Sequence, residues 1–215
     1  MELCLLPETL QCTVSLVDRF MANSRQLIIS EFQLVGVTSM LIASKFHEIR
    51  CPPISDFLRL TEDSFTRPAM LEMETRVLKT VDFAVQETVP LPVTLLENLC
   101  AASSDQSLPH DHDSDKLINA SYLIDLSLLY AEFLKFSNQD VVLSALRLSG
   151  VQHFCPGHRE SLEYLKCRKL LQDKASQVPV PAGLQNKYEG MTVLTNQTYL
   201  KCNKARNDLV WLVSN

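Results

Sequence analysis

The segment from Gln33 to Ile49, QLVGVTSMLIASKFHEI, has the most distinctive pattern of apolar residues in the chain. As a helix it carries apolar side chains around nearly its whole circumference and has no broad polar face. That is typical of a helix that its neighbours bury on most sides. We therefore expect it to be the central helix of a bundle. Lys45 is the exception, because it places a charge at the end of this apolar helix.

A second helix is predicted in TRPAMLEMETRVLKTV, which covers residues 66–81. Its apolar residues recur at helical spacing and form one stripe, made of Met70, Met73, Val77, Leu78 and Val81. Glu74 falls inside that stripe. Spacing alone leaves two interpretations open: Lys45 and Glu74 pair with each other or extend to water, or they bind a partner. The first is the more common fate of charged side chains.

Shorter helices are predicted on either side of these two. Pro7 suits the first turn of a helix, because its missing N–H has no intrahelical partner there. The apolar face of that helix is predicted from Leu10, Val14, Val17 and Phe20. Pro52 and Pro53 end the central helix, and ISDFLRL predicts a short helix after them. Thr66 is placed to cap the helix that contains Glu74.

The second half of the sequence predicts more helices between turns. A polar segment, AASSDQSLPHDHDSD, predicts a surface loop over residues 101–115. An amphipathic helix is predicted over 115–136, with Leu117, Ala120, Leu123, Ile124, Leu128 and Phe133 at helical spacing. Ser137 is placed to cap the next helix, which Gly150 ends. HRESLEYLKCRKLLQDKA predicts one more helix, and SQVPVPAGLQNKYEG predicts a turn and a short helix.

Charge and cysteine content exclude several classes of function. A net charge of −5 and a pI near 5.5 disfavour nucleic acid and anionic membranes as partners, since both attract basic surfaces. The seven cysteines are scattered without a CxxC pair, which favours reduced thiols over disulfides or a zinc site. The segment 110–113 alternates His and Asp in a polar loop, where we expect solvation rather than a metal. We expect no cofactor, no membrane span and no catalytic motif.

Four motifs, in this order, resemble the first cyclin box in the form found in A- and B-type mitotic cyclins: LLPETLQCTVSLVDRFM, QLVGVTSMLIASKFHEI, CPPISDFLRLT and MLEMETRVLKTVDFAV. The resemblance covers residues 3–92 and continues more weakly in LINASYLIDLSLLYAEFLKFSNQDVVLSALRL, which is similar to the start of the second box. It implies an all-α, cyclin-like helical bundle with the first box nearly complete and the second abbreviated. The implied domains are an N-terminal cyclin box over 1–88, a divergent C-terminal box over 89–190 and a tail over 191–215.

The resemblance also implies a function without chemistry of its own. Cyclins bind a cyclin-dependent protein kinase and hold its activating helix in place. We therefore expect a regulatory subunit, not an enzyme, that activates such a kinase in G2/M control of the cell cycle, in the nucleus and cytoplasm. Lys45 and Glu74 match the family's Lys and Glu that hydrogen-bond the kinase. The other implied kinase-binding residues are Ile42, Phe46, Glu48, Leu78, Phe83 and Val85.

The sequence departs from the family at several points. His47 stands where the family motif has its first Glu. The family's first helix, rich in Arg, Leu and Trp, would lie before residue 1, so we expect only Phe32 and Gln33 to remain of the groove that docks substrates or inhibitors. An Arg of that helix normally pairs with the family Asp that matches Asp18. A buried, unpaired Asp18 would cost about 3–5 kcal/mol, and Arg19 points elsewhere on a helix.

Alternatives to kinase activation stay open. The chain is then either a truncated or degenerate cyclin-like protein, or a cyclin fold that serves as an adaptor for transcription proteins or DNA without activating a kinase. The acidic balance of the chain argues against an adaptor for DNA. The mitotic form of the motif SKFHEI argues against an adaptor of either kind.

Overall fold

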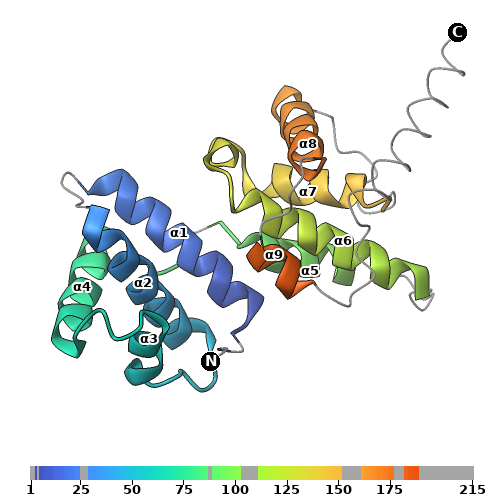
Figure 1. Ribbon diagram of the computed structural model, residues 1–215. Helices are drawn as coiled ribbons and strands as arrows, with labels where there is room; N and C mark the ends of the chain where they lie inside the picture. Colours follow the sequence, from blue (N-terminus) through green and yellow to red (C-terminus); the bar gives the residue numbers. More distant parts are fainter. Residues whose placement is uncertain are drawn as a thin grey trace, which may run out of the picture. The chain divides into compact units, whose positions relative to one another are not determined.

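The computed structural model describes residues 3, 5–24, 29–86, 89–102, 111–151, 161–176 and 182–188 (Figure 1). All regular structure in these residues is helical, so the predicted all-α class is confirmed. Contacts divide the chain into two compact units, Met1–Thr94 and Leu95–Asn215. The sequence places the boundary slightly earlier, between residues 88 and 89. The predicted tail lies outside the described residues.

The first unit is built around helix α2, Phe32–His47 (Figure 1). This helix packs against α1 (Pro7–Asn23), α3 (Ile54–Leu60) and α4 (Arg67–Thr80). Buried residues occur on almost every side of α2 and leave only its two ends exposed. The expected central helix is therefore present, and a short 3-10 turn, η1 (Ile29–Glu31), leads into it.

Helix α1 buries only part of the face predicted for it, because Phe20 is buried as predicted and the other three residues are not. Its buried residues are Thr9, Gln11, Cys12, Thr13, Leu16 and Phe20. Leu10 is instead 37% exposed, and Val14 and Val17 are only partly buried. The prediction fails at these positions because a threonine can be buried in place of an apolar residue once its hydroxyl is hydrogen-bonded. The Thr13 hydroxyl, for example, donates a hydrogen bond to the Thr9 carbonyl at 2.6 Å.

Two predicted hydroxyl caps are confirmed. Thr66 precedes α4, and its hydroxyl oxygen accepts a hydrogen bond from the Ala69 N–H at 3.3 Å. Ser137 precedes α7 (Asn138–Leu148), and its hydroxyl oxygen accepts a hydrogen bond from the Asp140 N–H at 3.1 Å. Each cap satisfies one of the N–H groups that the first turn of a helix leaves unpaired. Local sequence therefore determines where these two helices begin.

The second unit begins within α5 (Pro92–Ala102). It continues through α6 (Asp111–Ser127), α7, α8 (Leu162–Ala175) and the short α9 (Ala182–Lys187). One hydrophobic core joins residues from all five helices. The helices predicted around Leu165 and after the proline-rich segment correspond to α8 and α9.

Helix α6 begins earlier than predicted. Residues 103–110 of the expected surface loop lie outside the described part of the chain, but α6 starts at Asp111. The loop prediction is therefore wrong over 111–115. Aspartates near the beginning of a helix are favourable because the helix dipole places positive charge there. A run of polar residues was compatible with either a loop or a first helical turn.

Helix α6 also ends earlier than predicted, at Ser127 rather than at residue 136. The Ser127 hydroxyl donates a hydrogen bond to the Ile124 carbonyl at 2.6 Å. The chain then turns, and Phe133 is buried from a separate 3-10 helix, η2 (Ala131–Phe133). Helical spacing groups Phe133 with α6 because two short helices that share one core produce the same apolar pattern as one long helix.

A buried carboxylate holds α9 to α6. Asp125 is 6% exposed and accepts hydrogen bonds from Lys187 Nζ at 2.6 Å and from the Tyr188 hydroxyl at 2.7 Å. Burial is the main cause of a raised pKa at Tyr188, and the nearby negative charge of Asp125 raises it further. The Tyr188 hydroxyl therefore stays protonated and can donate. A cation and a neutral donor therefore compensate the cost of burying this charge.

We expect Leu171→Ala to lower the free energy of unfolding by about 3 kcal/mol, because Leu171 is fully buried in the core of the second unit. Leu134→Ala is a matched control in the same unit. Leu134 is 64% exposed, and its truncation should change stability by less than about 0.5 kcal/mol. Urea unfolding followed by circular dichroism measures both variants, and equal losses would contradict this packing.

Candidate functional site

The two charged residues singled out by the sequence meet in the structure. Lys45 lies in the last turn of α2 and Glu74 near the middle of α4. Lys45 Nζ donates a hydrogen bond to Glu74 Oε1 at 2.5 Å. The Lys45 side chain remains 49% exposed, whereas that of Glu74 is 14% exposed. The pair therefore forms at the surface, and its lysine keeps contact with solvent.

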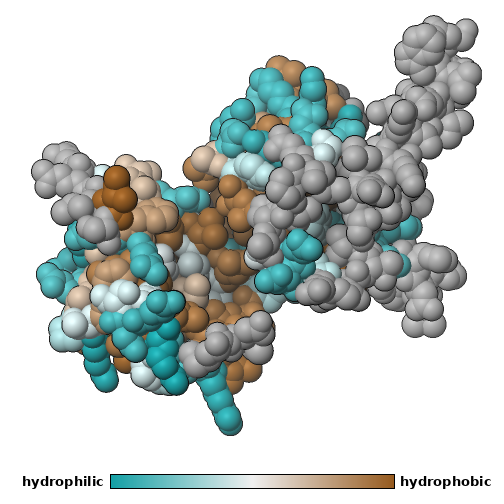
Figure 2. Space-filling model, in the orientation of Figure 1, coloured by the Kyte–Doolittle hydropathy of each residue, from teal (hydrophilic) through white to brown (hydrophobic). Residues whose placement is uncertain are grey.

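The apolar residues predicted beside this pair divide into two groups. Ile42 is buried, and Leu78 and Val85 are partly buried against the same core. Phe46 and Phe83 are 54% and 65% exposed. The first group supports the fold, and the second is available to a partner. On the face shown in Figure 2, hydrophobic and hydrophilic surface alternate over the unit Met1–Thr94.

Sequence analysis does not single out two further exposed residues of this region. Ile49, directly after the C-cap of α2, is completely exposed. Cys51 is an exposed free thiol. Burial raises the pKa of Cys51 in spite of Lys45. The available signal for Ile49 is its place between a buried helix and a proline pair, where no helix continues to bury it.

Glu48 contacts α1. Its Oε1 atom accepts hydrogen bonds from the Leu6 N–H at 2.8 Å and from the Thr9 hydroxyl at 2.6 Å. Leu6 is the N-cap residue of α1 and supplies no capping side chain of its own. The carboxylate of Glu48 therefore serves as the cap, at the end of α1 where the helix dipole favours negative charge.

His47 lies beside this contact. Its ring packs edge-on against that of Phe46, with centroids 4.9 Å apart. Its Nε2 atom is buried and has no hydrogen-bond partner among the described residues. Burial lowers the pKa of His47, and the carboxylates of Glu8 and Glu48 oppose that shift. The imidazole is therefore neutral near pH 7.

The turn after α4 has an unusual backbone. Asp82 and Phe83 both have positive φ, at 52° and 58°. Non-glycine residues pay about 1–2 kcal/mol for this left-handed conformation. The Phe83 N–H donates a hydrogen bond to the Leu78 carbonyl at 2.8 Å, which closes the turn. The exposed Phe83 ring is thus presented by a strained turn that the surrounding structure holds in place.

Helix α1 supplies the contacts that hold this turn. The Arg19 guanidinium donates hydrogen bonds to the Ala84 carbonyl at 2.6 Å and to the Val85 carbonyl at 2.8 Å. The Cys12 thiol donates to the Val85 carbonyl at 3.6 Å. Burial raises the pKa of Cys12 to about 11, which keeps this thiol protonated. The same helix therefore contacts the end of α2 and the turn after α4.

The burial of Asp18 costs less free energy than expected. The residue is only half-buried, and the described residues offer it no hydrogen bond or ion pair. Burial raises the pKa of Asp18. Because water still reaches this carboxylate, the penalty of a fully buried, unpaired charge does not apply. Arg19 points away from it, as predicted, and binds backbone carbonyls instead.

Phe32 and Gln33, the predicted remnant of a docking groove, are both exposed at the start of α2. Phe32 is 52% exposed. Lys45 lies in the last turn of the same helix. At about 1.5 Å per residue, the two ends of α2 are about 20 Å apart. The structure thus brings Lys45 and Glu74 together, and it places Phe32 and Gln33 at the opposite end of α2.

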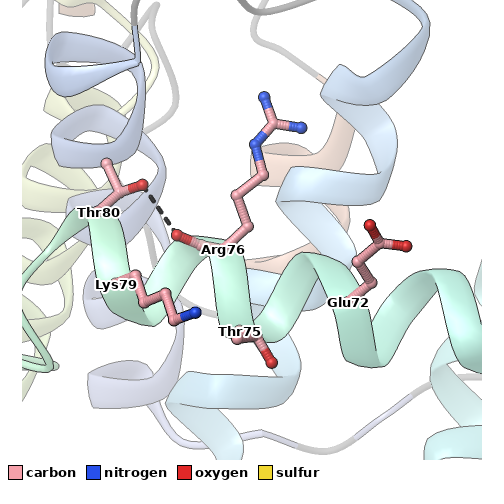
Figure 3. A pocket seen from close by; sticks show the side chains of 5 residues that line it. All are labelled: Glu72, Thr75, Arg76, Lys79 and Thr80. Atoms are coloured by element: carbon pink, nitrogen blue, oxygen red, sulfur yellow. Dashed lines mark hydrogen bonds between the residues drawn. The ribbon is translucent and has the colours of Figure 1, made fainter.

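A further groove follows another side of α4 (Figure 3). Its lining residues are Glu72, Thr75, Arg76, Lys79 and Thr80. Figure 3 shows Arg76 and Thr75 leaving the helix on opposite sides. Arg76 pairs with Glu31 at 3.0 Å and lies over the Phe20 ring. The groove is open, and its charges are mixed and partly engaged in holding α4 to the rest of the unit.

The described part of the chain contains no group of three His, Cys, Asp or Glu side chains placed to hold a metal ion. None of its helices combines the length and the apolar character that crossing a membrane requires. The described cysteines, Cys12, Cys51, Cys100 and Cys167, are free thiols. Burial raises the pKa of Cys167 to about 11, so it too stays protonated.

Comparison with known proteins identifies this architecture. The family model of the cyclin N-terminal domain matches residues 1–86. G2/mitotic-specific cyclin-B2 of Anguilla japonica is 35% identical over 145 residues, which cover 67% of this chain and 34% of that protein. Cyclin-A2-3 of Arabidopsis thaliana is 38% identical over 148 residues, covering 69% of this chain and 32% of that protein. The chain spans about a third of the length of these curated relatives.

A solved structure has the same fold. The X-ray structure of a viral cyclin from herpesvirus saimiri matches with a TM-score of 0.64, and the match covers 80% of this chain and 77% of that one. The two sequences are 20% identical over the match. At this level of identity the likeness concerns the arrangement of helices, and it confirms the predicted helical bundle.

We expect Arg19→Met to lower the free energy of unfolding by about 2 kcal/mol, because it removes two charged donors from the Ala84 and Val85 carbonyls. Arg59→Met is the matched control. Arg59 is exposed, and among the described residues its ion-pair partner is Asp56, one turn away on α3, so its loss should cost less than about 0.5 kcal/mol. Urea unfolding distinguishes them, and a cost at Arg19 no larger than that at Arg59 would contradict the anchoring of the turn.

Stability should fall as the pH drops through the range in which histidine titrates. The folded state holds the pKa of His47 below its ordinary value, so the unfolded chain takes up the proton first. The contribution of neutral His47 is fully present above the unfolded pKa of about 6.5 and is lost as the pH falls below it. Urea unfolding at several pH values should show this loss in the wild type and a smaller one in His47→Gln. If the free energy of unfolding depended on pH in the variant just as it does in the wild type, the assignment of this loss to His47 would be refuted.

Proposed function

The chain belongs to the cyclin family, and from that premise we propose that it is a regulatory subunit that binds a cyclin-dependent protein kinase and activates it in G2/M control of the cell cycle. The observation that carries the proposal is the Lys45–Glu74 pair, held at the surface where the buried helix α2 ends. The mitotic names of its relatives support the assignment to G2/M. The chain itself performs no chemistry in this proposal.

Lys45 and Glu74 would act by exchanging partners. A surface ion pair is worth at most about 1 kcal/mol, and Lys45 is half exposed, so opening the pair costs little. The lysine then donates to backbone carbonyls of the kinase helix, and the glutamate accepts from its N–H groups. Directed bonds of this kind fix register, and exposed apolar residues such as Phe46 and Phe83 add burial around them.

Activation follows from where the kinase is held. A protein kinase is active when a Lys–Glu pair and its magnesium site are both assembled, and that depends on the position of one helix. A subunit that binds this helix only in its active position shifts the kinase population toward the active state. We propose a second contact at Phe32 and Gln33, at the far end of α2, for substrates or inhibitors.

We expect Lys45→Ala and Glu74→Ala each to weaken kinase binding by about 30-fold, the loss of a hot-spot contact worth about 2 kcal/mol. Each should change the free energy of unfolding by less than about 1 kcal/mol. Lys79→Ala, on the groove side of α4, is the matched control and should bind like the wild type. Titration calorimetry against a panel of cyclin-dependent kinases measures the affinity.

Kinase assays on the same samples separate activation from binding. The proposal expects the wild-type chain to raise phosphorylation by at least one kinase of the panel, and the two variants to do so only at higher concentration. A folded wild-type chain that binds no member of the panel would refute the proposed function. Binding without any rise in phosphorylation would refute the activating role.

A further inference from the structure

We propose that Glu48 is a positioning residue rather than a kinase contact. It ties the end of α2 to the start of α1 and thereby holds the last turn of α2, with Lys45 and Phe46, in the shape that binds a partner. The inference rests on the proposed function for what the face binds. The contact itself belongs to the free chain and can be tested there.

The geometry joins two segments that are distant in sequence. One oxygen of Glu48 accepts from Leu6 N–H at 2.8 Å and from the Thr9 hydroxyl at 2.6 Å, across 42 and 39 residues. The Glu48 N–H donates to the Ser44 carbonyl at 3.0 Å and closes the last turn of α2. Glu48 therefore ends one helix with its backbone and caps another with its side chain.

Thr9 has no route to a partner. Its side chain lies on the buried face of α1 and is 0% exposed, so its hydroxyl can influence binding only through the group to which it donates. A charged acceptor at a helix N-terminus makes a stronger bond than a neutral one. The hydrogen bond between Thr9 and Glu48 can therefore be removed by a substitution at Thr9, a residue that a partner cannot contact.

The contact between Glu48 and α1 lies beside the residues that need a fixed conformation in order to bind. After Glu48, Ile49 is completely exposed, and the next helix begins only at Ile54. Helix ends fray unless something holds them. Lys45 and Phe46 lie within three residues of Glu48, so a frayed end would have to be ordered again at the moment of binding. A preformed end avoids that entropic cost.

Two interpretations of Glu48 predict opposite results. If Glu48 contacts the kinase with its charge, Glu48→Gln should weaken kinase binding as much as Glu48→Ala does. Changes at Thr9 should then leave the affinity unchanged. If Glu48 positions the end of α2, Glu48→Gln should be tolerated, because the glutamine oxygen accepts from the same two donors. Thr9→Val should then weaken binding although it lies in the interior.

The experiment measures kinase affinity by titration calorimetry for six chains, the wild type and five variants, at a temperature where circular dichroism shows all of them folded. We expect about a tenfold loss for Glu48→Ala and for Thr9→Val, and less than about a threefold loss for Glu48→Gln. The double variant Thr9→Val/Glu48→Ala should lose no more than Glu48→Ala alone, because both changes remove one contact.

Thr13→Val is the matched control. Thr13 is buried on the same face of α1, but its hydroxyl bonds within the helix to the Thr9 carbonyl. Its replacement removes a buried hydroxyl without touching Glu48, so affinity should stay within about twofold of the wild type. Equal losses for Thr9→Val and Thr13→Val would overturn the inference, as would a Glu48→Gln variant that binds as poorly as Glu48→Ala.

Hydrogen exchange in the free chain keeps this test separate from that of the proposed function. The amide of Glu48, bonded to Ser44, should exchange about tenfold faster in Thr9→Val than in Thr13→Val, since it reports opening of the last turn. Faster exchange supports the contact even for a chain that binds no kinase. Unchanged exchange in a chain that does bind would overturn this inference and leave the proposed function standing.

Discussion

The burial of α2 on almost every side is the constraint on which the first unit depends. A helix without a polar face has to be surrounded, and α1, α3 and α4 supply the surrounding surface. The burial stops at the last turn, where Lys45 and Phe46 are exposed. The same apolar character that makes α2 the centre of the fold therefore makes its end a surface where apolar and charged groups lie together.

Helix α1 carries none of the predicted partner-binding residues, yet both edges of the candidate face are anchored to it. Near its start, Leu6 and Thr9 donate to Glu48 at the end of α2. Further along, Arg19 donates to two carbonyls of the turn that presents Phe83. The face is thus held by hydrogen bonds from helix α1, which itself contributes none of the predicted binding residues.

The sequence predicts the elements better than the contacts between them. Hydrophobic periodicity identifies the central helix, and Thr66 and Ser137 locate two helix starts because capping is a local property. Periodicity fails for part of α1, whose buried face contains two threonines with hydrogen-bonded hydroxyls, Thr13 within the helix and Thr9 to Glu48. It also merges Phe133 with α6, because residues of two helices that share a core have the same spacing.

The candidate site shows the same division. Spacing marks Lys45 and Glu74 as anomalies and leaves their pairing with each other as one of two interpretations. The structure shows that pair, formed across 29 residues. Family resemblance points to Glu48 as a binding residue, whereas its contacts with α1 depend on tertiary structure that no local pattern encodes. Ile49 is missed for a related reason, since its exposure follows from where the chain leaves α2.

Photo-crosslinking from the end of α2 shows directly whether a kinase binds this face. A benzophenone amino acid in place of Phe46, which is 54% exposed, keeps an aromatic ring on the candidate face. We expect it to crosslink to the activating helix of a cyclin-dependent kinase, while the same group at Leu134, exposed in the second unit, does not. Crosslinks from position 134 but none from position 46 would contradict the assignment of this face.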